Sequence, residues 1–160
     1  MNTAQTTTNR RQAFWVVRTI LNPIAKVILR SPLHGVMSRR LLLMTFSGRK
    51  SGKQYTTPIS YVQQGRTLLL GVGGPWWKNL RRGVPVQVRL RGKTYAGCAE
   101  AWTDEASMSR VYRTILAQNP TQARFMGIRA TADGQPASHD IQQARKLGAA
   151  VVEISLDSGQ

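Results

Sequence analysis

The chain has 160 residues, 41% of them hydrophobic, which is enough for one domain with a sizeable core. Its formal net charge of +16 is uneven, because residues 1–99 hold 17 of the 23 Lys and Arg side chains and no acidic one. This asymmetry indicates a polyanionic partner: nucleic acid, an anionic membrane, or a ligand with several phosphates or carboxylates. A generally basic surface is the alternative explanation. The single cysteine, Cys98, excludes an internal disulfide and a multi-cysteine metal site.

The N-terminal part divides into two segments. Residues 1–9 are polar, and we expect them to form a disordered tail. Residues 10–40 are predicted to form an amphipathic helical segment, since apolar side chains recur at helical spacing and basic ones mark the other side. Pro23 should kink this helix or divide it. Residues 10–30 can lie on an anionic membrane or pack on the domain.

Residues 41–157 are predicted to form one domain of strands with helices inserted late. The six predicted strands lie at 41–47, 54–63, 67–72, 84–90, 93–102 and 149–156. Helical spacing and capping residues predict one or two turns at 76–82 and helices at 104–118, 121–128 and 138–147. Short turns between consecutive strands favour an antiparallel meander, and closing it into a barrel removes exposed strand edges.

A basic turn joins the first two predicted strands. Ser47-Gly48-Arg49-Lys50-Ser51-Gly52-Lys53 carries three cations and no acidic neighbour. These cations repel one another, so the pattern indicates a bound anion, held by charge, by the Ser51 hydroxyl and by backbone N–H groups. The segment is too short for a phosphate-binding Walker loop and lies between strands, which excludes that motif.

A second segment offers aromatic surface. The glycines of 71–74 allow close approach of the backbone to a flat ring, and Trp76-Trp77-Lys78-Asn79 adds indoles, a cation and an amide at the start of a short helix. Adjacent helical side chains point in different directions, so at most one tryptophan should line a pocket. Paired carboxylates and hydrolase or metalloprotease motifs are lacking in the sequence, which predicts no metal site and leaves cofactor-based redox chemistry open.

The run from Leu43 to Lys53, followed by Thr57-Pro58, Gly73-Gly74 and Trp76-Trp77-Lys78-Asn79-Leu80, resembles the deazaflavin (F420)-dependent nitroreductase family of the flavin-binding split-barrel superfamily. The resemblance implies an α+β fold. It would be a six-stranded, mostly antiparallel split β-barrel with an N-terminal helix and helices before the last strand. It also implies coenzyme F420 as the cofactor, with FMN as the alternative.

The resemblance assigns cofactor-binding roles to two groups of residues. The phosphate and oligoglutamate tail of F420 would be held by Arg49, Lys50, Ser51, Gly52 and Lys53. The deazaflavin side would be lined by Thr57, Pro58, Gly73, Gly74, Trp77, Lys78 and Asn79, and Thr45 and Trp76 are further candidate cofactor-binding residues. A tail made of carboxylates suits the basic half of the chain better than the single phosphate of FMN does.

The function implied is an F420H2-dependent oxidoreductase that transfers a hydride to a hydrophobic acceptor such as a quinone or a nitro compound. The proton would come from solvent or from a hydroxyl such as that of Ser60 or Tyr61. The sequence departs from the reductases that carry tyrosines after the late helix, because Gln122 and Phe125 occupy the comparable stretch.

Other functions remain open from the sequence. The barrel could carry FMN or a tetrapyrrole such as haem without F420 chemistry, with His34 and His139 as axial candidates. Specific nucleic-acid binding is not expected, since the basic residues are dispersed and no recognised module is present. We expect a cytoplasmic protein, with peripheral contact to the inner face of the membrane through residues 10–30, and a homodimer is compatible with this type of barrel.

Overall fold

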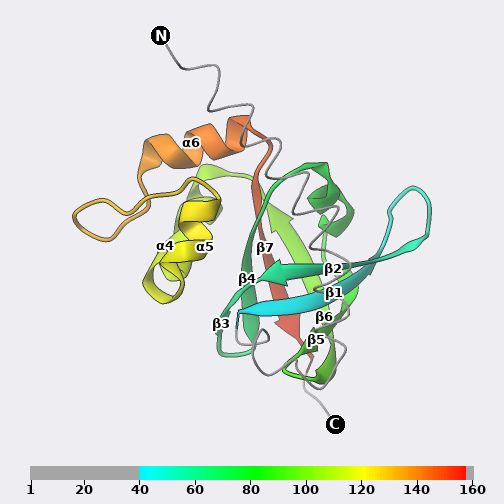
Figure 1. Cartoon of the computed structure of the whole chain (residues 1–160). Coiled ribbons are helices and arrows are strands. Elements are labelled where there is room, and N and C mark those ends of the chain that lie inside the picture. The colour runs from blue at the N-terminus through cyan, green and yellow to red at the C-terminus, as the bar shows by residue number, and fades with distance from the viewer. Residues whose placement is uncertain (1–39, 158–160) are drawn as a thin grey trace.

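The structure is a computed structural model that describes residues 40–157, so the predicted tail and most of the N-terminal helical segment lie outside the described residues. Seven strands form one curled sheet, coloured along the chain in Figure 1. They are β1 (Leu41–Ser47), β2 (Gln54–Ser60), β3 (Val62–Gln64), β4 (Thr67–Val72), β5 (Val84–Leu90), β6 (Lys93–Trp102) and β7 (Ala150–Leu156). A 3-10 helix, η2 (Pro75–Leu80), precedes β5, and α4 (Glu105–Gln118), α5 (Pro120–Phe125) and α6 (Ser138–Lys146) are inserted before β7.

The sheet has the order β2-β1-β5-β6-β7-β4-β3, and every pairing in it is antiparallel. The expected α+β class and the helices before the last strand are therefore confirmed. The expected pairing of consecutive strands is found for β1–β2, β3–β4, β5–β6 and β6–β7. The order departs from a meander because β5 pairs with the distant β1, and β7 pairs with β4 as well as with β6.

The prediction of six strands was wrong by one, because the strand expected at 54–63 breaks at Tyr61. The Tyr61 N–H donates to the Arg40 carbonyl, 3.2 Å away, while β2 pairs with β1 and β3 pairs with β4. The two ends of the strand order are thus joined by a single residue, which brings the two edges of the curled sheet together in the manner of a split barrel.

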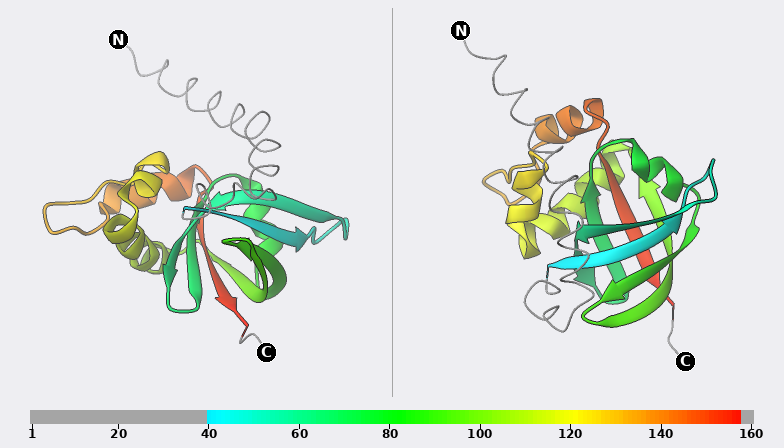
Figure 2. Two further views of the ribbon diagram at one scale, coloured as in Figure 1. Left: turned by 60° about the horizontal axis from the view of Figure 1, so that its bottom comes forward. Right: turned by 45° about the vertical axis from the view of Figure 1, so that its right-hand side comes forward.

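The sheet separates two hydrophobic cores. Leu68 and Leu70 of β4 point into the curl, where they pack with residues of β1, β5 and β7. Leu69, between them, points to the opposite face and packs with α4 and α6. This alternation is the period of two of a β-strand buried on both faces. Figure 2 shows the three helices gathered on one side of the strands. No helix within residues 40–157 is long and apolar enough to cross a membrane.

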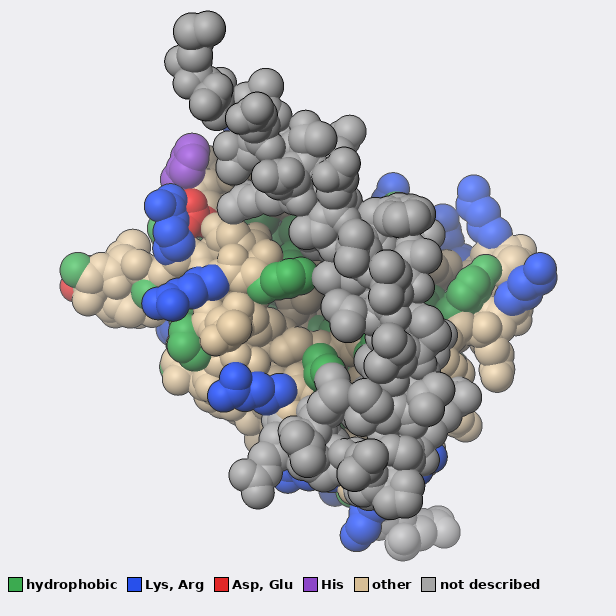
Figure 3. Space-filling view, in the orientation of Figure 1, with side chains coloured by type: hydrophobic (Ala, Val, Ile, Leu, Met, Phe, Trp, Pro, Cys, Tyr) green, Lys and Arg blue, Asp and Glu red, His purple; other side chains and the backbone are tan. Residues whose placement is uncertain are grey.

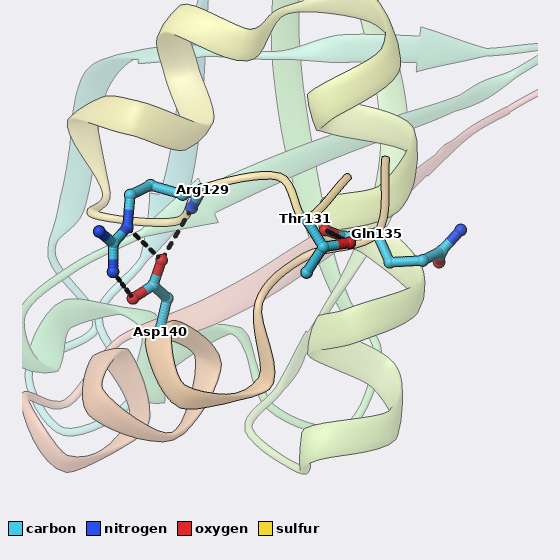
Figure 4. A network of polar contacts seen from close by, with 4 residues as sticks. All are labelled: Arg129, Thr131, Gln135 and Asp140. Carbon is cyan, nitrogen blue, oxygen red and sulfur yellow. Dashed lines mark hydrogen bonds and ion pairs between the residues drawn. The ribbon is translucent and has the colours of Figure 1, made fainter. Parts of the chain in front are cut away.

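An ion pair fixes the loop between α5 and α6 (Figure 4). The guanidinium of Arg129 donates to both carboxylate oxygens of Asp140 at 2.9 Å, and the Arg129 backbone N–H donates to the same carboxylate at 3.0 Å. These bonds hold the pKa of the buried Asp140 below its usual value. Thr131 and Gln135 close the loop through the Gln135 carbonyl. These contacts tie the loop that follows α5 to the first turn of α6.

Candidate functional site

The basic turn between β1 and β2 is a closed loop that projects from the body of the barrel (Figure 1). The Gly48 N–H donates to the Lys53 carbonyl and the Gly52 N–H to the Gly48 carbonyl, both at 2.8 Å. A Cβ on Gly48 would lie 2.7 Å from both Ser51 Oγ and a ring carbon of Tyr55, so a larger residue there would displace these exposed side chains. Gly52 has a φ of +65°, in the left-handed region that favours glycine. The glycines therefore build the loop.

The turn keeps its positive charge available. Arg49, Lys50 and Lys53 are exposed, and none of them forms an ion pair within residues 40–157. Lys and Arg side chains gather at this projecting loop, at the right of the view in Figure 3. The backbone N–H groups of Lys50 and Ser51 also donate to no group of the described chain. Three cations, a hydroxyl and two N–H groups form the donor set that a phosphate and a chain of carboxylates require.

Asn79 connects this turn to η2, which lies 30 positions further along the chain. The Arg49 N–H donates to Asn79 Oδ1 at 3.0 Å, and Asn79 Nδ2 donates to the Trp76 carbonyl at 2.8 Å. Gly74, with a φ of +79°, precedes η2, and Lys78 is exposed on it. The two segments that the sequence singled out separately are therefore joined in one site. The Asn79 amide holds the turn in place by its side chain.

Three aromatic rings form a row beside the turn. The rings of Trp76 and Phe46 are 5.6 Å apart and inclined by 27°, and those of Phe46 and Tyr55 are 5.8 Å apart and inclined by 29°. Tyr55 remains 46% exposed at the outer end of the row. Phe46 and Tyr55 were not among the residues predicted to bind the cofactor. The signal was present, because they are cross-strand partners equally distant from the turn, and such pairs share one face of a hairpin.

The two tryptophans of η2 have different roles. Trp77 is 6% exposed and lies in the core inside the curled sheet, where its indole N–H donates to the Gly148 carbonyl at 3.0 Å. The guanidinium of Arg81 lies 4.8 Å from the centre of its ring. The expectation that Trp77 lines the deazaflavin therefore does not fit its position. Trp76, which is only partly buried, is the tryptophan placed to line a binding surface.

The remaining candidate ring-side residues do not share one surface. Thr57 is the register partner of the buried Met44 and points toward the inside of the curl. Thr45 and Pro58 point to the other face, where the Thr45 hydroxyl lies 2.9 Å from the hydroxyl of Thr56. A single flat ring cannot contact both sets of side chains across the sheet.

Gly71, in the glycine-rich end of β4, is needed for packing against a helix. A Cβ on Gly71 would lie 2.5 Å from the hydroxyl oxygen of Tyr112, which is completely buried on α4. The space left by Gly71 is therefore occupied by this tyrosine and is not open to a ligand. Gly73 and Gly74 lie beyond the packed part of the strand and are partly exposed.

Ser60 and Tyr61 lie at the end of the β1–β2 hairpin away from the turn. Ser60 pairs with Leu41 and Gln54 with Ser47, a separation of six residues, or roughly 20 Å along the strand. The Ser60 carbonyl accepts a hydrogen bond of 3.0 Å from Gln122 Nε2, whose amide is buried. Tyr61 is 4% exposed. The candidate proton donors and Gln122 are thus brought together, apart from the basic turn.

Of the two histidines considered for haem binding, the structure places one. His139 is exposed on α6, and His34 lies outside the described residues. Within residues 40–157, no group of three His, Cys, Asp or Glu side chains could hold a metal ion.

Comparison with known proteins agrees with the donor set of the turn. Residues 31–131 match the model of the family described as F420H(2)-dependent quinone reductase. The chain belongs to this family. It is therefore an oxidoreductase, and coenzyme F420 is its cofactor. The resemblance to F420-dependent reductases is confirmed, with quinone reductases as the matching family. A search of curated proteins found no significant match.

Two solved structures share the fold. One is an F420-H2 dependent reductase (FDR-A), with a TM-score of 0.50 and 18% identity over 72% of this chain and 94% of that one. The other is described as a domain-swapped dimer, with a TM-score of 0.52 and 18% identity over 89% of this chain and 98% of the other. At this identity the likeness concerns the fold alone, and it supports the split-barrel arrangement of the sheet.

Proposed function

We propose that the protein uses F420H2 to reduce a hydrophobic acceptor of the quinone type, and that the basic turn holds the phosphate and the polycarboxylate tail of the cofactor. The observation that carries this proposal is the donor set of the turn: Arg49, Lys50 and Lys53 have no ion-pair partner in the described chain. The deazaflavin supplies a hydride when it is bound. The protein supplies position and electrostatics.

The ring side of the site is assigned to the surface next to the turn. Trp76 offers a partly exposed aromatic face, and Gly73 and Gly74 leave the backbone accessible beside it. Both the oxygen and the nitrogen of the Asn79 amide bind backbone groups. We therefore assign Asn79 the role of positioning the turn, with no direct contact to the cofactor. Lys78 adds a cation at the same edge. Ser60 and Tyr61 lie at the far end of the β1–β2 hairpin from this surface, so we assign the proton for the acceptor to solvent.

The cellular setting is inferred from the charge of the N-terminal half of the chain. The excess of basic residues in 1–99 supports a cytoplasmic protein in peripheral contact with the anionic inner face of the membrane, through residues 10–30. A hydrophobic quinone acceptor would be reached there. A homodimer is proposed by analogy with the structural relative described as a domain-swapped dimer.

The cofactor assignment is tested by titrating the purified full-length protein with F420 and with FMN while recording tryptophan fluorescence. We expect F420 to bind more tightly than FMN, because its tail adds carboxylates that reach the cations of the turn. Absence of F420 binding tighter than the high micromolar range would contradict the proposal. A preference for FMN would contradict it as well.

The role of the turn is tested with Lys50→Ala and Lys53→Ala, compared with Lys146→Ala at the exposed end of α6. We expect each turn variant to weaken F420 binding more at low salt than at high salt, since salt already screens the attraction between exposed charges. The Lys146 variant should bind as the unmodified protein does. An equal loss at both salt concentrations would argue against a charge role.

A further inference from the structure

A second basic site lies at the opposite end of β1 from the turn. A pocket of about 450 Å³ is lined there by Arg40, Tyr61, Gln63, Arg91, Gln118 and Asn119, among others. These residues come from the start of β1, the β2–β3 junction, the β5–β6 turn and the end of α4. The volume is within the range of about 300–1,000 Å³ that is common for small-molecule sites.

The sheet register explains why two arginines meet at this pocket. Leu43 of β1 pairs with Arg89 of β5, and the strands run antiparallel. Continuing the same register by two residues places Arg91 beside the start of β1, next to Arg40. Both arginines are exposed, and neither forms an ion pair within the described chain. No acidic side chain is found among the described residues that line the pocket.

Amide groups complete the lining. Asn119 accepts the Gln122 N–H with its Oδ1, so its NH2 group is left without a partner in the described part of the chain. The Gln63 NH2 group donates to the Gly65 carbonyl at 3.0 Å, which fixes this side chain at the rim. Gln118 is exposed beside them. Guanidinium groups with neighbouring amide donors are suited to bind the oxygens of a carboxylate or a phosphate.

The backbone at Arg91 gives an independent indication. Arg91 has a φ of +49° and Gly92 a φ of +81°, so both central residues of this two-residue hairpin turn are left-handed. Such turns favour Asn, Asp or Gly at the first position, and a long side chain there has a conformational cost. Turn formation therefore does not explain the arginine. Its exposed guanidinium is available to line the pocket.

We propose that this pocket binds a small molecule bearing a carboxylate or phosphate group, with Arg40 and Arg91 as its anion-binding residues. The site is separate from the basic turn, since the two ends of β1 are roughly 20 Å apart. The proposal does not depend on the assignment of F420 to the turn.

The experiment is isothermal titration of the full-length protein without cofactor, at constant ionic strength, with citrate in one arm and pyrophosphate in the other. Citrate tests the carboxylate source and pyrophosphate the phosphate source. Arg91→Gln and Arg40→Gln are compared with Arg124→Gln, an exposed arginine of α5 outside the pocket. We expect the pocket variants to weaken binding of at least one of the two anions by about tenfold or more, and the Arg124 variant to leave it unchanged.

Arg91→Gly keeps the proposal testable if a polar substitution disturbs the turn. Glycine adopts the backbone conformation of this position without strain, so this variant should unfold at the same temperature or higher while still losing anion binding. Unchanged affinity for both anions in Arg91→Gly would overturn the proposal. Loss of binding in Lys50→Ala and Lys53→Ala, with no loss in Arg91→Gly, would also overturn it and place the anion on the turn.

Discussion

Replacing Asn79 by alanine tests whether the turn is positioned by η2. The change removes two hydrogen bonds, from the Arg49 N–H at 3.0 Å and to the Trp76 carbonyl at 2.8 Å. At about 1 kcal/mol for each net hydrogen bond, the loss is about 2 kcal/mol. If all of it appears in cofactor binding, the affinity for F420 falls by roughly 30-fold, since 1.4 kcal/mol corresponds to tenfold. The hairpin still restrains the turn, so a loss of about threefold to 30-fold is expected.

The salt dependence separates positioning from charge. Asn79→Ala removes no charge, so the slope of F420 affinity against salt concentration should equal that of the unmodified protein, whereas Lys50→Ala should reduce it. F420 titrations at several salt concentrations measure both quantities. Gln87→Ala, an exposed polar residue of β5, serves as the matched control. Unchanged affinity in Asn79→Ala, or a reduced slope like that of Lys50→Ala, would refute the reasoning.

Three further predictions concern the stability of the fold. The Tyr112 hydroxyl is buried and has no hydrogen-bond partner among residues 40–157, and burial raises its pKa, so Tyr112→Phe should increase the free energy of unfolding by about 1 kcal/mol in urea denaturation. Gly71→Ala should lower the free energy of unfolding by about 1–3 kcal/mol, because the added methyl group meets that hydroxyl. Adding Tyr112→Phe to Gly71→Ala should recover part of this loss. Strictly additive effects of the two changes would contradict the contact. Asp140→Asn should make the free energy of unfolding less dependent on pH in the acid range. The folded pKa of Asp140 is held below 3.8 by Arg129, so its stabilising effect is present above that pH and lost as the pH falls through the folded value. A variant with the same acid profile as the unmodified protein would refute this role.

Much of the fold was accessible from local patterns. Alternating apolar residues located the strands, and the helix predicted at 104–118 is found at Glu105–Gln118, capped by Asp104, whose carboxylate accepts the Ser107 N–H at 2.8 Å. The break at Tyr61 was not predicted, because a change of pairing partner leaves no interruption in the run of strand-forming residues. The order of the strands was also missed, since local spacing carries no information on which distant strands pair.

The sequence by itself determined the basic turn, its glycines and the family, because these depend on residues that are neighbours in the chain. Only the tertiary structure decided how the site is assembled. It showed that Asn79 holds the turn, that Trp76 and not Trp77 faces outward, and that Arg40 and Arg91 share a pocket. Each of these contacts joins segments 30 or more residues apart or depends on which face an element buries. The physical reason is that the curl of the sheet sets β1 against β5 and η2 against the turn.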